Sequence, residues 1–211
     1  MVQTKCSGQV RSQNINMSKI DGYKKELLTF DLMKANLYAI FSIIPVLILY
    51  GVPFVLLWRN TFSKVALKSF IHEFTLGIWG NFVSILLVMT IGIIAHELIH
   101  GITWAMYTKN GFKSIKFGVL WKVLTPYCHC SEPLKVKHYI TGAIMPAIIL
   151  GFLPFVYSLF TGNALWLFFG IFFTMSAVGD FLIVNLVRKE NMNSLVLDHP
   201  SEVGCYVFRK E

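Results

Sequence analysis

Long apolar runs dominate the pattern of hydrophobic and polar positions along this 211-residue chain. A run of about 18 residues with few charges is long enough to cross a lipid bilayer as a helix. Four runs meet this length: Ala35–Trp58, Asn81–Met106, Gly142–Phe160 and Ala164–Val187. Charged residues make up only 14% of the chain, against about 25% in soluble domains. The pattern therefore predicts an all-α membrane protein with about four transmembrane helices.

Two shorter patterns occupy the connections between these runs. From Ile115 to Val123, between the second and third runs, apolar residues alternate with other residues as in a strand, and Pro126 and Pro133 follow. We expect one or two strands there, on the cytoplasmic face. Their open edge would bind an extended peptide by strand addition, or the hairpin would serve packing alone. In the first connection, the helical spacing of apolar residues in Phe62–Phe74 predicts an interfacial amphipathic helix.

Basic residues define the expected orientation and domain organisation. Six Lys and Arg precede the first run, six lie in the second connection and four follow the last run, whereas the first connection holds three. Basic residues accumulate in cytoplasmic segments, so we expect both termini on the cytoplasmic side of the cell membrane. Residues 1–34 would form a basic tail without a signal peptide, 35–187 the transmembrane domain and 188–211 a second cytoplasmic tail. This placement explains the net charge of +8 without a nucleic-acid partner.

The four cysteines agree with this orientation. Cys6, Cys128, Cys130 and Cys205 all fall in segments expected to lie in the cytoplasm, where thiols stay reduced. The Cys-His-Cys stretch around His129 has no second cluster of metal ligands, so the sequence does not favour a structural zinc site there.

Candidate chemistry comes from four ionisable side chains within the predicted spans: His96, Glu97, His100 and Asp180. Such groups are costly at bilayer depth unless they are paired, hydrated or bound to a metal. His96 and His100 are four residues apart and therefore share one helix face, from which both imidazoles can reach one zinc ion. Glu97 completes the HExxH pattern, in which the glutamate acts as a general base.

The position of Asp180 fits the same site. In the expected orientation the second and fourth spans run in the same direction, and His96 and Asp180 lie 15 and 16 residues after Asn81 and Ala164. At about 1.5 Å per residue, both lie at a similar depth. Asp180 is therefore the candidate third ligand, which would leave one position for water. A structural hydrogen-bonded cluster is the alternative, and the next candidate ligands are in the second connection, at His129 and Glu132.

Several motifs resemble those of a known family. The stretches AHELIHG, TPYCHCSEPLKVKHYITGAIMP, GDFLIVNL and DHPSEVGCYV together look like the putative zincin peptidase family of small bacterial multipass membrane proteins, over about Thr90 to Phe208. The arrangement is also similar to the site-2 protease class of intramembrane zinc metalloproteases. That resemblance implies His96 and His100 as zinc ligands, Glu97 as the catalytic base and Asp180 as the third ligand. Asp180 lacks the Asn-Pro-Asp-Gly context usual in that class.

The sequence thus predicts a zinc-dependent, membrane-embedded endopeptidase with Zn²⁺ as cofactor. Its partners would be the lipid bilayer and a membrane-anchored protein or peptide substrate cut near the cytoplasmic face, and homo-oligomers remain open. Two other functions are compatible with the same residues. One is a divalent-metal transporter, although four spans without a visible inverted repeat are few for alternating access. The other is a non-catalytic membrane adaptor with a structural cluster of His, Glu and Asp.

Overall fold

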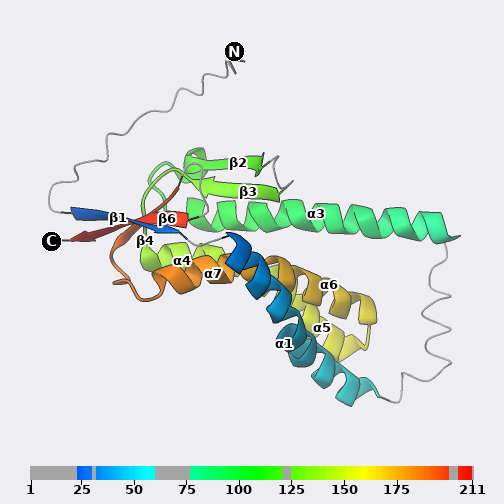
Figure 1. The fold of residues 1–211 in the computed structure, drawn as a ribbon. Helices are drawn as coiled ribbons and strands as arrows, with labels where there is room; N and C mark the ends of the chain where they lie inside the picture. The colour runs from blue at the N-terminus through cyan, green and yellow to red at the C-terminus, as the bar shows by residue number, and fades with distance from the viewer. Residues whose placement is uncertain (1–22, 30–31, 60–76, 121–124, 200–203, 211) are drawn as a thin grey trace, which may run out of the picture.

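The computed structural model describes residues 23–29, 32–59, 77–120, 125–199 and 204–210. Most of these residues are helical, and six short strands complete the fold (Figure 1). The elements follow in the order β1 (Tyr23–Thr29), α1 (Leu32–Trp58), α3 (Gly77–Ala105), a 3₁₀ turn η1 (Gly111–Ser114), β2 (Ile115–Leu120), β3 (Thr125–Cys130), β4 (Leu134–Lys135), α4 (Val136–Pro146), a π-helical turn η2 (Ala147–Phe152), α5 (Leu153–Thr161), α6 (Ala164–Ser176), α7 (Val178–Val187), β5 (Leu195–Asp198) and β6 (Gly204–Lys210).

The helices reproduce the predicted spans with two differences. Within the described residues, α1, α3 and the continuous α4–η2–α5 helix are each long and apolar enough to cross a membrane. The third of these begins at Val136, six residues before the predicted start at Gly142. The predicted fourth span is broken: α6 and α7 meet at a bend of 42°, and together they form one further candidate span. The apolar composition of this run, from which the span was predicted, does not indicate where the helix breaks.

Close packing joins the helices at the end of the bundle remote from the sheets. Tyr50 and Phe54 of α1 are buried against Phe155 of α5 and Leu167 of α6. A Cβ on Gly170 would lie 2.7 Å from the carbonyl oxygen of Gly151, so glycine is required where α6 crosses the π-helical turn. The outward faces of α1 and α3 remain apolar and exposed, as expected for helix surfaces that face lipid.

Two antiparallel sheets lie at the other end. Strands β2 and β3 form the hairpin predicted in the second connection, and they lie alongside α3 in Figure 1. The second sheet has the order β1-β6-β5-β4, so it joins strands from before the first span, from the second connection and from after the last span. The sequence analysis placed strands only in the second connection, and β1, β5 and β6 correct that expectation.

Strands β1 and β6 escaped the sequence analysis for a physical reason. Strand β1 is exposed at most positions and does not alternate between apolar and polar residues. Strand β6 buries several residues on both faces, which removes the period of two that marks a half-buried strand. The amphipathic helix predicted at Phe62–Phe74 lies outside the described residues.

A second core connects this sheet to the helices. Val196 of β5 and Val207 of β6 are fully buried together with Tyr139 of α4 and Trp104 near the end of α3. The four-stranded sheet therefore packs directly on α3 and α4, the helices beside the candidate site.

Candidate metal centre

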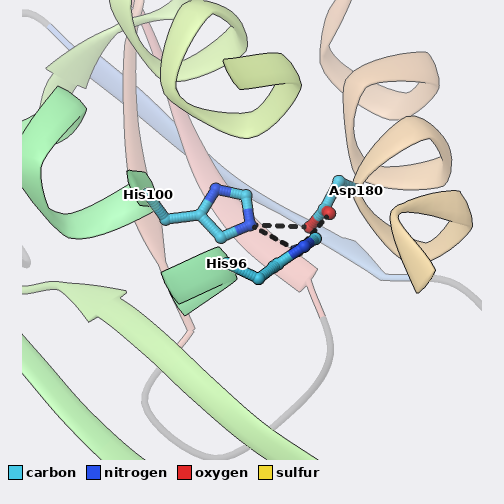
Figure 2. Close-up of side chains that lie close together, drawn as sticks. All are labelled: His96, His100 and Asp180. Carbon is cyan, nitrogen blue, oxygen red and sulfur yellow. Dashed lines mark hydrogen bonds and ion pairs between the residues drawn. The ribbon is translucent and has the colours of Figure 1, made fainter. Parts of the chain in front are cut away.

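Helix α3 brings His96 and His100 to one buried position. The two residues are one helical turn apart, and their Nε2 atoms are 3.2 Å from each other. Asp180, 84 positions after His96, enters from the first turn of α7 (Figure 2). Its Oδ2 atom lies 3.2 Å from His96 Nε2, and its Oδ1 atom lies 3.3 Å from His100 Nε2. The predicted convergence of these three side chains is therefore observed.

The break between α6 and α7 places Asp180 in this position. Helix α6 ends at Ser176 and α7 begins at Val178, so Asp180 falls in the first turn of a new helix rather than in the middle of a straight one. The positive end of a helix dipole stabilises a carboxylate in the first turn. Helix α7 packs against α4, and α4 packs against α3, which holds the acid opposite the two histidines.

A supporting set of residues fixes the orientation of His100. Its Nδ1–H donates to the carbonyl of Gly142 at 2.8 Å, and because a carbonyl only accepts, the Nε2 atom keeps its lone pair for the site. The Trp104 indole stacks on the His100 ring at 5.2 Å, and its Nε1–H donates to the Tyr139 carbonyl at 3.1 Å. A Cβ on Gly142 would lie only 2.1 Å from Trp104 Nε1. The sequence analysis missed this set, since a backbone acceptor has no residue-type signature.

Glu97 lies beside the three converging side chains, at the boundary between α3 and the hairpin. It is partly buried, and its carboxylate faces the backbone N–H of Cys128 in β3, which packs against α3. The hairpin thus reaches the residue expected to act as the base. This contact also escaped the sequence analysis, which identified the strand pattern but not the edge that faces α3.

The three side chains fit a zinc ion by chemistry and by geometry. Two imidazoles and a carboxylate are common zinc ligands, with bonds of about 2.0–2.1 Å. In a tetrahedron with such bonds, neighbouring ligand atoms are about 3.3–3.4 Å apart. The two Nε2 atoms are 3.2 Å apart, close to this edge length, and one ligand atom from each of the three residues lies within 4.8 Å of the other two. No other group of His, Cys, Asp and Glu in the described part of the chain gathers in this way.

One atom at the site has no partner within the described residues. His96 Nδ1 is buried and forms no hydrogen bond there. The Nε2 atom of the same ring is the one that faces His100 and Asp180. The two ring nitrogens of His96 therefore differ in surroundings, and only Nε2 lies among groups that can share a metal.

The alternative ligands from the second connection are engaged elsewhere. Glu132 accepts hydrogen bonds from Ser114 Oγ at 2.7 Å, from the backbone N–H of Lys109 and from the side chain of Asn110. These bonds, above all the one from Ser114, lower the pKa of Glu132 below its usual value. His129 instead approaches Asp198, at 3.8 Å. Neither residue belongs to the group formed by His96, His100 and Asp180.

The cysteines of the hairpin behave as buried thiols. Cys130 is almost fully buried and its thiol approaches the carbonyl of Glu132 at 3.3 Å. Burial raises the pKa of Cys130 to about 12, and burial likewise raises the pKa of Cys128 well above the usual range. Among the described residues neither thiol belongs to the group formed by His96, His100 and Asp180.

Comparison with known proteins adds a family and one relative. A family model described as "Putative zincin peptidase" matches residues 89–195, just over half of the 211-residue chain. A protein of Pyrococcus woesei, named "Uncharacterized 24.7 kDa protein in gap 5'region", is 32% identical over 111 residues. This match covers 50% of the chain and 47% of the relative, so the chain spans about half the length of that protein. No solved structure matches the chain.

Proposed function

The chain belongs to the putative zincin peptidase family, and from this premise we propose that it is a zinc-dependent endopeptidase embedded in a membrane. Its substrates are membrane-anchored proteins or peptides, cut near the cytoplasmic face. The observation that carries the proposal is the convergence of His96, His100 and Asp180 from two helices, with Glu97 of the HExxH motif at its side. The arrangement of ligands on two separate apolar helices supports a mechanism similar to that of site-2 proteases.

The chemistry divides between the ion and the protein. A zinc ion held by His96, His100 and Asp180 supplies a Lewis acid that polarises the scissile carbonyl and acidifies water. Glu97 accepts the proton of the attacking water and then delivers it to the nitrogen of the leaving amine, so the water oxygen forms the new carboxyl group. The Gly142 carbonyl holds the ring of His100 in the tautomer that presents Nε2.

The site's surroundings support cleavage at a membrane surface. Helices α3 and α7, which carry the site, are parts of candidate spans, whereas both sheets lie at one end of the bundle. The distribution of basic residues favours this end as the cytoplasmic one. A substrate whose own span lies in the bilayer would meet the site where its chain leaves the apolar layer.

The proposal is tested with purified protein in detergent. Metal analysis should give about one zinc per chain, and fluorescein-labelled casein serves as a general unfolded probe in the cleavage assay. Glu97→Gln should retain zinc but lower cleavage by about 10²–10⁴-fold, because an amide cannot accept the proton of water. Glu190→Gln is the matched control, since it removes a carboxylate that pairs with Arg209 outside the site.

Two results would contradict the proposal. Unchanged cleavage by Glu97→Gln would exclude this glutamate as the base. If the protein cleaves nothing but carries zinc or another divalent ion into liposomes, the alternative function as a divalent-metal transporter is favoured.

A further inference from the structure

We propose that Asp198, in strand β5 after the last span, is a positioning residue of this centre, because its carboxylate fixes strand β3 and β3 in turn holds Glu97. This inference rests on the proposed function and extends it to a segment outside the HExxH motif and outside residues 89–195 that match the family model. It follows from three sets of contacts.

The first set lies at Asp198 itself. Its Oδ2 atom accepts a hydrogen bond from the backbone N–H of Cys130 at 2.9 Å. Its Oδ1 atom accepts from the hydroxyl of Tyr139, a fully buried residue of α4, at 2.5 Å. His129 Nδ1 lies 3.8 Å from Oδ2. One carboxylate therefore joins the tail strand to both the hairpin and α4.

The second set lies on the edge of β3 that faces away from β2. In an antiparallel pair, alternate residues direct their N–H groups out of the ladder. Cys128 and Cys130 are two positions apart and both direct their N–H groups outward, the first toward the Glu97 carboxylate and the second in a hydrogen bond to Asp198. Pro126, the preceding residue of the same parity, has no N–H. Both outward donors in this part of β3 therefore face a carboxylate, one at the centre and one from the tail.

This geometry couples the two acids through a short piece of backbone. A strand is stiff over two residues, so the bond at Cys130 fixes where the Cys128 N–H lies. The Cys128 N–H in turn limits where the Glu97 carboxylate can lie. Removing the acceptor at Asp198 frees one end of this connection without replacing any of the three proposed ligands.

The third set connects Asp198 to the other side of the centre. The Tyr139 ring stacks on Trp104 at 5.4 Å, and Trp104 stacks on His100. Asp198 thus contacts β3, which lies against Glu97, and Tyr139, the outermost ring of the aromatic stack on His100. A buried carboxylate is a costly way to anchor a tail, since burial raises the pKa of Asp198 against the bonds from Tyr139 and Cys130.

The test compares three substitutions at one position. Asp198→Asn keeps both bonds, because its oxygen accepts from Cys130 while its amide donates to the Tyr139 hydroxyl. Asp198→Leu has the same shape but no acceptor. Asp198→Glu keeps the acid and displaces it by one methylene. Glu190→Gln is the control, since it removes a carboxylate that pairs with Arg209 of the same sheet and leaves the bonds of Asp198 unchanged.

Two measurements apply to each variant as a full chain in detergent. Hydrogen exchange of the peptide covering residues 125–131 reports on β3 and needs no activity. Casein cleavage with zinc content reports on the centre. We expect Asp198→Leu and Asp198→Glu to lower kcat about tenfold or more with zinc retained, because small displacements of catalytic groups have large effects on rate. In Asp198→Leu the amides of β3 should also exchange faster. Asp198→Asn and Glu190→Gln should remain close to the wild type.

Each outcome separates the two proposals. If the wild-type protein cleaves nothing, the proposed function fails, while the exchange of β3 still tests the positioning role. Wild-type exchange of β3 in Asp198→Leu would overturn that role. If Asp198→Leu does not fold, Asp198→Glu decides: cleavage equal to wild type means that Asp198 only anchors the tail.

Discussion

Replacing Gly142 by alanine should weaken zinc binding without touching any of the three proposed ligands. A Cβ at this position would lie 2.1 Å from Trp104 Nε1 and 2.2 Å from its Cδ1. Carbon atoms in contact are about 3.5–4.0 Å from their neighbours, so either the indole or α4 must move by more than about 1 Å. The indole is not free to rotate away, because it is stacked between His100 and Tyr139 and bonded to the Tyr139 carbonyl.

The displacement acts on His100 by two routes. If the indole moves, the ring of His100 loses its stacked neighbour; if α4 moves, the Gly142 carbonyl that accepts from His100 Nδ1 moves with it. Metal sites tolerate errors of only about 0.2 Å in ligand distances. Loss of a group that orients a ligand typically lowers metal affinity about 10–100-fold, which corresponds to about 1.4–2.7 kcal/mol. We expect a zinc affinity reduced in this range, despite the higher helix propensity of alanine.

The assay is competition for zinc with a chromophoric chelator in detergent. Gly179→Ala is the matched control, because it also replaces a helical glycine beside the site, and no atom lies within 4 Å of its added Cβ. Equal zinc affinity for folded Gly142→Ala and Gly179→Ala would refute the reasoning.

Three further predictions concern the ligands, the thiols and the topology. Asp180→Asn should lower zinc affinity by more than the roughly 100-fold that follows loss of a supporting residue. Asp180→Glu should keep part of the zinc affinity, and the same competition with a chelator measures both variants. In a Cys6→Ser protein, Cys130 and Cys205 should resist maleimide at pH 8 until the chain is unfolded, because a pKa of about 12 leaves about one thiol in ten thousand as thiolate. Rapid labelling in the folded state would contradict this. In a cysteine-free background, an impermeant reagent added to intact cells should label Asn163→Cys and not Lys189→Cys; the reverse result would invert the proposed orientation.

The sequence predicts the helices better than the sheets. Long apolar runs indicate spans by length alone, and the structure contains helices of matching length and composition. The bend before Asp180 and the tail strands depend on contacts between segments far apart in the chain, which no local pattern records. Strand β1, for example, becomes a strand because β6 pairs with it.

The candidate site divides in the same way. His96, Glu97 and His100 are visible because their spacing is local, and Asp180 is visible because an acid in an apolar run is rare. The supporting contacts use the backbone of Gly142 and Cys128, whose residue types give no hint of them. Asp198 lies in a tail where an acid is unremarkable by composition. The proposed ligands and base were therefore predictable, and the residues that orient them were not.

The order of strands in the larger sheet limits how often the chain can cross a bilayer. Strand β1 precedes α1, β4 lies between α3 and α4, and β5 and β6 follow α7, yet all four belong to one hydrogen-bonded sheet. A continuous sheet cannot have strands on opposite sides of an apolar layer, because its backbone groups need partners throughout. The number of crossings between any two of these strands must then be even. Among the described residues, the candidate spans α1 and α3 would provide two crossings before β4. From β4 to β5, α4–α5 would provide one, and we infer that the bent pair α6–α7 would count as a single further crossing, with its bend inside the layer.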